Sequence, residues 1–142
     1  MLSSLQLTTL HSLMDRIVPP DEDAGAWDAG VATYLERQFD RDLRDYQETY
    51  QLGLDTLEAE ARASAQQSFA ALSVTEQEAL LRRIEAGSVV HPWPTDPAKF
   101  FQAVVQHVTE GYYSDPGNGG NHNSVAWHML GYLPGRPESA QS

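Results

Sequence analysis

The chain has 142 residues, which fits one domain with its own hydrophobic core and excludes two domains of ordinary size. Its 20 acidic and 9 basic residues give a net charge of −11, which argues against nucleic acids and anionic membranes as partners, because both are bound through clustered Lys and Arg. The sequence contains no cysteine, so disulfides, thiolate catalysis and cysteine-ligated metal sites are excluded.

The first predicted helix has both a start signal and a stop signal. Ser3-Ser4-Leu5-Gln6 is a plausible capping sequence, and Pro19-Pro20 ends the helix because proline cannot continue it. Between these signals apolar side chains recur at helical spacing: Leu7, Leu10, Leu13, Met14 and Ile17. The acidic stretch Asp21-Glu22-Asp23 then indicates a solvated loop, with a calcium site as the less favoured alternative.

Two more helices are predicted before residue 71. One begins near Ala29, and the next begins near Leu43 and continues through an alanine-rich stretch to about Ala70. Gly53 interrupts the longer pattern at a cost of ~1 kcal/mol relative to alanine, so it predicts a close crossing with another helix.

The second half of the chain begins with a capping box. Ser73-Val74-Thr75-Glu76 predicts the start of a helix, and Gly87 predicts its end. Residues 88–94 are expected to form a stiff extended loop, after which Asp96-Pro97 starts another helix. Apolar residues cover more than half the circumference of that helix, so we expect it to be the central one.

Residues 110–135 combine a glycine- and asparagine-rich stretch with flanking aromatic side chains. Such a stretch favours an ordered loop with several sharp turns, followed by a short helix over residues 124–130. No strand signal appears, so the predicted fold is all-α, with five to six helices. Residues 1–135 are expected to form a single helical domain, and residues 136–142 a frayed tail.

The ordered loop has two interpretations. It is either a well-packed structural turn or a surface held in one shape so that another protein can dock on it. Aromatic side chains are enriched at the centres of interfaces, which favours docking. The candidate partner-contact residues are Tyr112, Tyr113, Asn118, Asn121, Trp127 and Tyr132.

Catalytic motifs are absent from the sequence: it has no P-loop, no G-x-S-x-G and no H-E-x-x-H. We therefore assign no catalytic, cofactor-binding or metal-binding residue, and we favour a binding or accessory role. A rival hypothesis is a small metal-dependent enzyme that uses His107, His122 and His128 together with Asp115. A third is a stand-alone helical module that has lost its partner.

The chain from about residue 10 to residue 135 resembles the gluconate 2-dehydrogenase subunit 3 family. The resemblance depends on the order and spacing of short pieces, the most specific of which lie in the second half. In the first half they are Asp15-Arg16-Ile17-Val18-Pro19, Gly25-Ala26, Ala29-Gly30-Val31, Tyr34-Leu35, Tyr50 and Gly53-Leu54. In the second half they are Phe69, Leu72, Gln77, Leu80-Leu81, Phe100-Phe101, Thr109-Glu110-Gly111-Tyr112-Tyr113, Asp115-Pro116, Gly119-Gly120-Asn121, Trp127 and Gly131-Tyr132.

The resemblance implies an all-α subunit without an active site of its own. Members of the family associate with a large FAD-bearing catalytic subunit of the glucose–methanol–choline oxidoreductase type, often together with a multihaem cytochrome c. The small subunit supports the folding, stability and export of that partner. The chain itself is then expected to hold no cofactor, with FAD in the large subunit and haem c in a possible third subunit.

Two features depart from the family pattern. The sequence shows no twin-arginine leader, so we expect a periplasmic location only if a leader has been removed or the partner carries one, and a cytoplasmic location otherwise. The usual Gly-Tyr-Pro-Gly ending has one additional residue here, in Gly131-Tyr132-Leu133-Pro134-Gly135. No apolar run is long enough to cross a bilayer, so direct membrane insertion is not expected.

Overall fold

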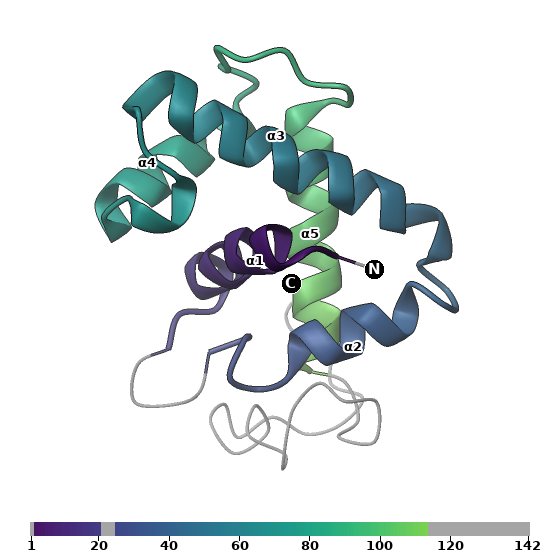
Figure 1. Ribbon diagram of the computed structural model, residues 1–142. Coiled ribbons are helices and arrows are strands. Elements are labelled where there is room, and N and C mark those ends of the chain that lie inside the picture. Colours follow the sequence, from purple (N-terminus) through teal and green to yellow (C-terminus); the bar gives the residue numbers. More distant parts are fainter. Residues whose placement is uncertain (1, 21–24, 114–142) are drawn as a thin grey trace.

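The computed structural model describes residues 2–20 and 25–113 (Figure 1). Over these ranges the chain forms α-helices and two short 3-10 helices and contains no strand, which confirms the all-α prediction. The α-helices are α1 (Ser4–Ile17), α2 (Val31–Gln38), α3 (Gln47–Ala65), α4 (Val74–Glu85) and α5 (Pro97–Tyr112). The 3-10 helices are η1 (Arg44–Tyr46) and η2 (Phe69–Ala71).

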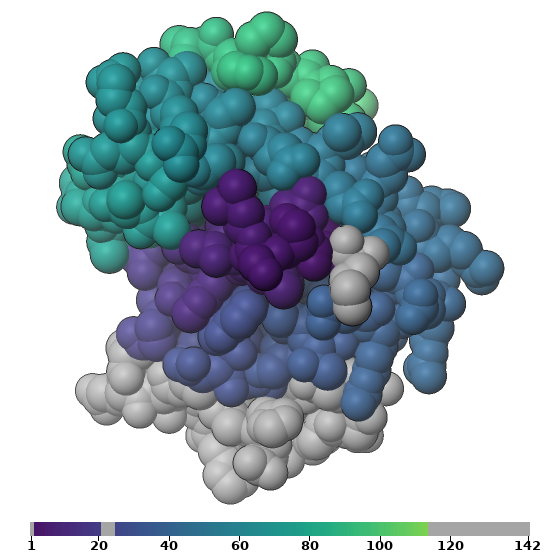
Figure 2. Space-filling model, viewed as in Figure 1, coloured from purple at the N-terminus to yellow at the C-terminus, as the bar shows by residue number. Residues whose placement is uncertain are grey.

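Helix α5 is the centre of the domain, as its wide apolar face predicts. It packs against α1, α2, α3 and α4, and Figure 1 shows α3 crossing one end of it and α2 crossing the other. Four of its buried side chains belong to the hydrophobic core of the described residues: Phe100, Val104, Val108 and Tyr112. Figure 2 shows the start of α1 on one face of the molecule, between α3 and α2.

Local capping sequences set three helix starts at their predicted places. Ser3 and Gln6 form a reciprocal capping box at α1, with Gln6 N donating to Ser3 Oγ at 3.1 Å and Ser3 N to Gln6 Oε1 at 2.8 Å. Ser73 and Glu76 do the same at α4. At α5 the Asp96 carboxylate accepts hydrogen bonds from Ala98 N and Lys99 N, as an N-cap residue should.

Helix α3 ends at Ala65, so the predicted extension to Ala70 is wrong. Gln66 takes the left-handed conformation, with φ of 58°, which stops the helix. The chain then turns so that Phe69 is fully buried, with its N–H donated to Glu58 Oε1 at 3.0 Å. Its carbonyl accepts from Gln77 Nε2 at 2.9 Å. Two side-chain hydrogen bonds, from residues 11 and 8 positions away, thus hold Phe69 outside the helix that the alanine-rich sequence favours.

The close crossing predicted at Gly53 lies between α3 and α5. A Cβ atom on Gly53 would be 2.1 Å from Cε1 of Phe100, so no larger residue fits without displacing that ring. The absent side chain makes room for the Phe100 ring of α5 against the backbone of α3.

A buried carboxylate holds the extended loop of residues 88–94 against α3. Glu60 is fully buried and accepts hydrogen bonds from Val90 N at 2.8 Å, His91 N at 3.0 Å and the Trp93 indole N–H at 3.2 Å. Three donors compensate the desolvation of this carboxylate, and they fix the path of the chain into α5.

Four sequence predictions lie wholly or partly outside the described residues. They are the acidic stretch at 21–23, the glycine- and asparagine-rich loop, the short helix over 124–130 and the frayed tail over 136–142.

Candidate partner-binding end of the bundle

The end of α5 packs against the start of α2 toward the bottom of Figure 1, and the turn before α2 is hydrogen-bonded to Val18, the residue after α1. We call this region the α1–α2–α5 end and define it by residues 15–20, 25–34 and 108–113. It contains several of the sequence pieces that resemble the accessory-subunit family, including Gly25-Ala26 and Gly111-Tyr112-Tyr113.

Gly25 joins the end of α1 to the turn that leads into α2. A Cβ atom here would be 2.6 Å from the carbonyl oxygen of Val18 and 2.8 Å from the nitrogen of Pro20. The next residue, Ala26, donates its N–H to that same Val18 oxygen at 3.2 Å. Because the obstructing atoms belong to the backbone, only glycine fits this contact.

Gly111 performs the corresponding role between α2 and α5. A Cβ atom on Gly111 would be 2.6 Å from Cδ2 of Tyr34 and 3.1 Å from Cγ1 of Val31. The ring of Tyr34 therefore lies directly on the backbone of α5. Burial raises the pKa of the Tyr34 hydroxyl, and the carboxylates of Glu110 and Asp42 raise it further.

The two tyrosines predicted to contact a partner have different environments. Tyr112 is 0% exposed and belongs to the chain's own core, whereas Tyr113 is half-buried. Their rings meet edge to face, with centroids 5.3 Å apart. The other four candidates, Asn118, Asn121, Trp127 and Tyr132, lie outside the described residues, so the contact role of this end stays a prediction.

Trp27 adds an aromatic surface to this end that sequence reasoning did not single out. Its half-buried ring stacks on the imidazole of His11, with centroids 4.3 Å apart and an interplanar angle of 11°. His11 Nε2 lies 3.4 Å from Asp15 Oδ2. Burial raises the pKa of the Asp15 carboxyl, while His11 and Arg16 oppose that rise. The sequence did contain one signal for Trp27, because this residue directly follows Gly25-Ala26, one of the pieces that carry the family resemblance.

His107, the one described member of the proposed metal set, is a core residue. Its Nδ1 atom is 3.0 Å from the Tyr50 hydroxyl. The rings of Tyr46 and His107 meet edge to face, with centroids 4.7 Å apart. Desolvation lowers the pKa of His107, against a smaller opposing influence of Glu110. Among the described residues no three His, Asp or Glu side chains gather as a metal site. His122, His128 and Asp115 lie outside them.

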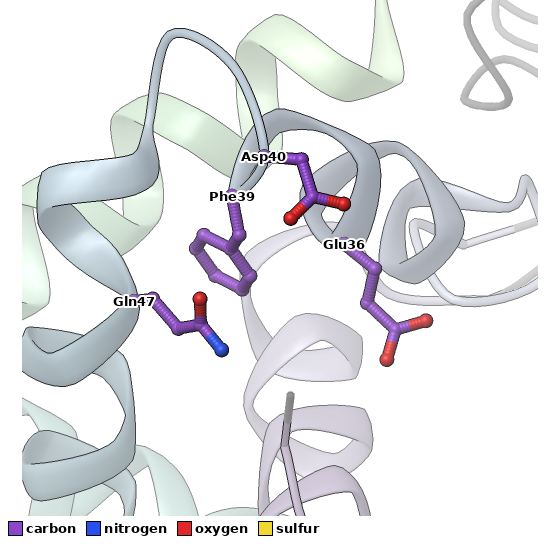
Figure 3. A pocket seen from close by; sticks show the side chains of 4 residues that line it. All are labelled: Glu36, Phe39, Asp40 and Gln47. Atoms are coloured by element: carbon purple, nitrogen blue, oxygen red, sulfur yellow. The ribbon is translucent and has the colours of Figure 1, made fainter.

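A shallow hollow of about 190 Å³ lies between the end of α2 and the start of α3. Figure 3 shows the Phe39 ring between the Gln47 amide and the carboxylates of Glu36 and Asp40. The hollow contains no pairing of a nucleophile with a base, so its lining residues suggest no covalent catalysis.

No helix within the described ranges has both the length and the apolar character needed to cross a membrane.

Comparison with known proteins places the chain in a family. The family model for gluconate 2-dehydrogenase subunit 3 matches residues 4–135, a range that contains the five α-helices described above for residues 2–20 and 25–113. No curated protein and no solved structure matches the chain. The chain belongs to the gluconate 2-dehydrogenase subunit 3 family.

Proposed function

We propose that this chain is a non-catalytic accessory subunit that binds and stabilises an FAD-dependent sugar or alcohol dehydrogenase subunit. The observation that carries the proposal is the extent of the family match, residues 4–135. A match of this extent supports reading the described helices as a single subunit of that family.

The geometry of the α1–α2–α5 end supports a binding role. Gly25 and Gly111 allow backbone contacts that a side chain would prevent, so the elements at this end are packed closely. The half-buried rings of Trp27, Tyr34 and Tyr113 lie on this close-packed frame. A surface that is already ordered loses little conformational entropy when a partner binds, which favours association.

The cofactors of the reaction belong to other subunits in this proposal. FAD is held by the large subunit, and haem c by a cytochrome subunit where one is present. The location of the chain follows that of its partner: the periplasm if either protein is exported with a leader, and the cytoplasm otherwise.

Copurification tests the proposal. The chain, carrying an affinity tag, is co-expressed with a candidate flavoprotein of the glucose–methanol–choline type and purified through the tag. We expect a complex with the visible absorbance of bound flavin, and dehydrogenase activity that the isolated chain lacks. A colourless chain without a copurifying flavoprotein would contradict the proposal. A stoichiometric metal in that preparation would instead favour the rival metal-dependent enzyme.

A further inference from the structure

A second hollow, of about 160 Å³, lies where α1, α4 and α5 meet. Arg16 is the one lining residue from α1, and the others belong to α4 and to the first half of α5. Its lining combines charged and apolar side chains: Arg16, Glu78, Leu81, Arg82, Glu85 and Phe101. The volume is below the range of about 300–1,000 Å³ that small-molecule sites occupy, so the hollow fits a single side chain better than a cofactor.

The guanidinium of Arg16 is largely buried, and among the described residues its compensation is incomplete. Its side chain is only 12% exposed, and its Nε finds no acceptor among the described residues. Within the described part of the chain, the carboxylate oxygen that lies nearest is Oε2 of Glu78, 3.7 Å from Nη1, which is too long for a hydrogen bond. A buried guanidinium carries five N–H donors and a large desolvation cost. At least the Nε–H donor of Arg16 has no acceptor among the described residues.

The side chains that line the hollow indicate which chemical group could accept hydrogen bonds from Arg16. A guanidinium matches a carboxylate geometrically, because two parallel N–H groups meet two oxygens. Arg82 adds a second, exposed guanidinium at the rim, and Leu81 and Phe101 supply an apolar wall for a short aliphatic stem. Glu78 is 43% exposed and Glu85 is exposed, so water already solvates both of these competing carboxylates.

We propose that this hollow receives the carboxylate of a Glu or Asp side chain from the partner subunit, which pairs with Arg16. The inference depends on the proposed function, because it needs a partner polypeptide. In the free chain Glu78 compensates part of the Arg16 charge from a distance. In the complex the incoming carboxylate accepts hydrogen bonds from the Arg16 N–H groups to which Glu78 does not bond.

The test compares Arg16→Met with Arg83→Met in binding to the purified flavoprotein subunit. Both changes remove a guanidinium, but Arg83 is exposed on α4 and does not line this hollow. We expect Arg16→Met to raise the dissociation constant at least about tenfold, because a charge-assisted bond is lost. Arg83→Met should leave the constant within about twofold of wild type, because surface charges contribute little.

The stability of the free chain separates a binding role from a structural one. Removing a poorly compensated buried charge should leave the melting temperature of Arg16→Met unchanged or higher. If the Arg16–Glu78 pair were mainly structural, Arg16→Met and Glu78→Gln would both lower that temperature, and the inference would be overturned. Circular dichroism checks the fold, and Arg16→Gln replaces Arg16→Met if the latter does not fold.

The remaining outcomes are distinguishable. Wild-type binding by Arg16→Met overturns the inference but leaves the proposed function intact, whereas failure of the wild-type chain to bind any flavoprotein overturns both. Inorganic phosphate and acetate are titrated against the free chain as probes of a small-anion site. If either raises the melting temperature of wild type but not of Arg16→Met, the ligand is a free anion, and the partner carboxylate is rejected.

Discussion

Single buried residues position whole segments of this protein, and Glu60 is the clearest case. Its carboxylate accepts hydrogen bonds from two backbone N–H groups and one indole, all of them about thirty positions later in the chain. The sequence offered no local signal for this role, because a glutamate on a helix is usually solvated.

Replacing Glu60 with glutamine should destabilise the domain. The amide keeps one acceptor oxygen but brings an NH₂ group toward the N–H donors, so at least one buried donor loses its acceptor. We expect the free energy of unfolding in urea to fall by about 1–3 kcal/mol. Glu85→Gln, on the exposed surface of α4, is the control and should change little. Equal stability of Glu60→Gln and wild type would contradict the assigned role.

His107 predicts a pH dependence of stability. Its pKa in the folded state lies below the ordinary value of 6.5, mainly because burial disfavours the charged imidazolium. The unfolded chain therefore binds this proton more tightly. The contribution of His107 to the free energy of unfolding is fully present above pH ~6.5. It is lost as the pH falls from that value toward the lower pKa that His107 has in the folded protein.

The measurement compares unfolding free energies of wild type and His107→Gln between pH 7.5 and 5. The wild-type curve should fall more steeply on acidification, with an extra slope of at most about 1.4 kcal/mol per pH unit. His107→Gln should lose stability at all pH values, because the Tyr50 hydrogen bond is altered, but its curve should be flatter. Parallel curves would show that His107 is not the titrating group.

At the scale of the helices, close crossings depend on missing side chains. Gly53→Ala places a methyl group where the Phe100 ring now lies, so α3 and α5 must separate or the ring must move. Although alanine favours a helix by ~1 kcal/mol over glycine, we expect net destabilisation of about 1–3 kcal/mol from overpacking. Thermal unfolding measures the change.

Ala103→Gly on α5 is a useful comparison for this substitution. It removes a methyl group at a half-buried position and should cost about 1 kcal/mol through helix propensity alone. A Gly53→Ala protein more stable than wild type would mean that Phe100 repacks freely and that the crossing does not need glycine.

The helix starts were predictable from sequence because their determinants are local. The capping residues of α1, α4 and α5 lie within three positions of the groups they bind. The end of α3 was not predictable, because Glu58 and Gln77 hold Phe69 through contacts 11 and 8 positions away. Likewise the sequence could not tell that Tyr112 faces the core while Tyr113 is partly exposed, since both are aromatic residues at the end of one helix.

At the scale of the whole molecule, we propose that the partner binds at one end of the bundle. The α1–α2–α5 end was only partly predictable: residues 112 and 113 were chosen from the sequence, whereas Trp27, Tyr34 and Arg16 emerged from packing. Their positions depend on contacts between helices far apart in the sequence, which no single segment encodes.

Matched surface substitutions test that assignment. Thr33→Arg and Thr109→Arg each place a bulky charge on an exposed position of α2 or α5 at this end, and Thr75→Arg makes the same change on α4. We expect the first two to weaken binding of the flavoprotein about tenfold or more, because a misplaced charge at an interface is costly. Thr75→Arg should bind like wild type. Equal binding by all three would place the interface elsewhere.

The most direct measurement of the central claim is sedimentation of the purified chain mixed with the purified FAD-bearing subunit, followed by the visible absorbance of the flavin. The account predicts that the flavin signal sediments faster when the chain is present, and that the chain alone oxidises no sugar or alcohol. A flavin signal that sediments identically with and without the chain, or turnover by the chain alone, would contradict it.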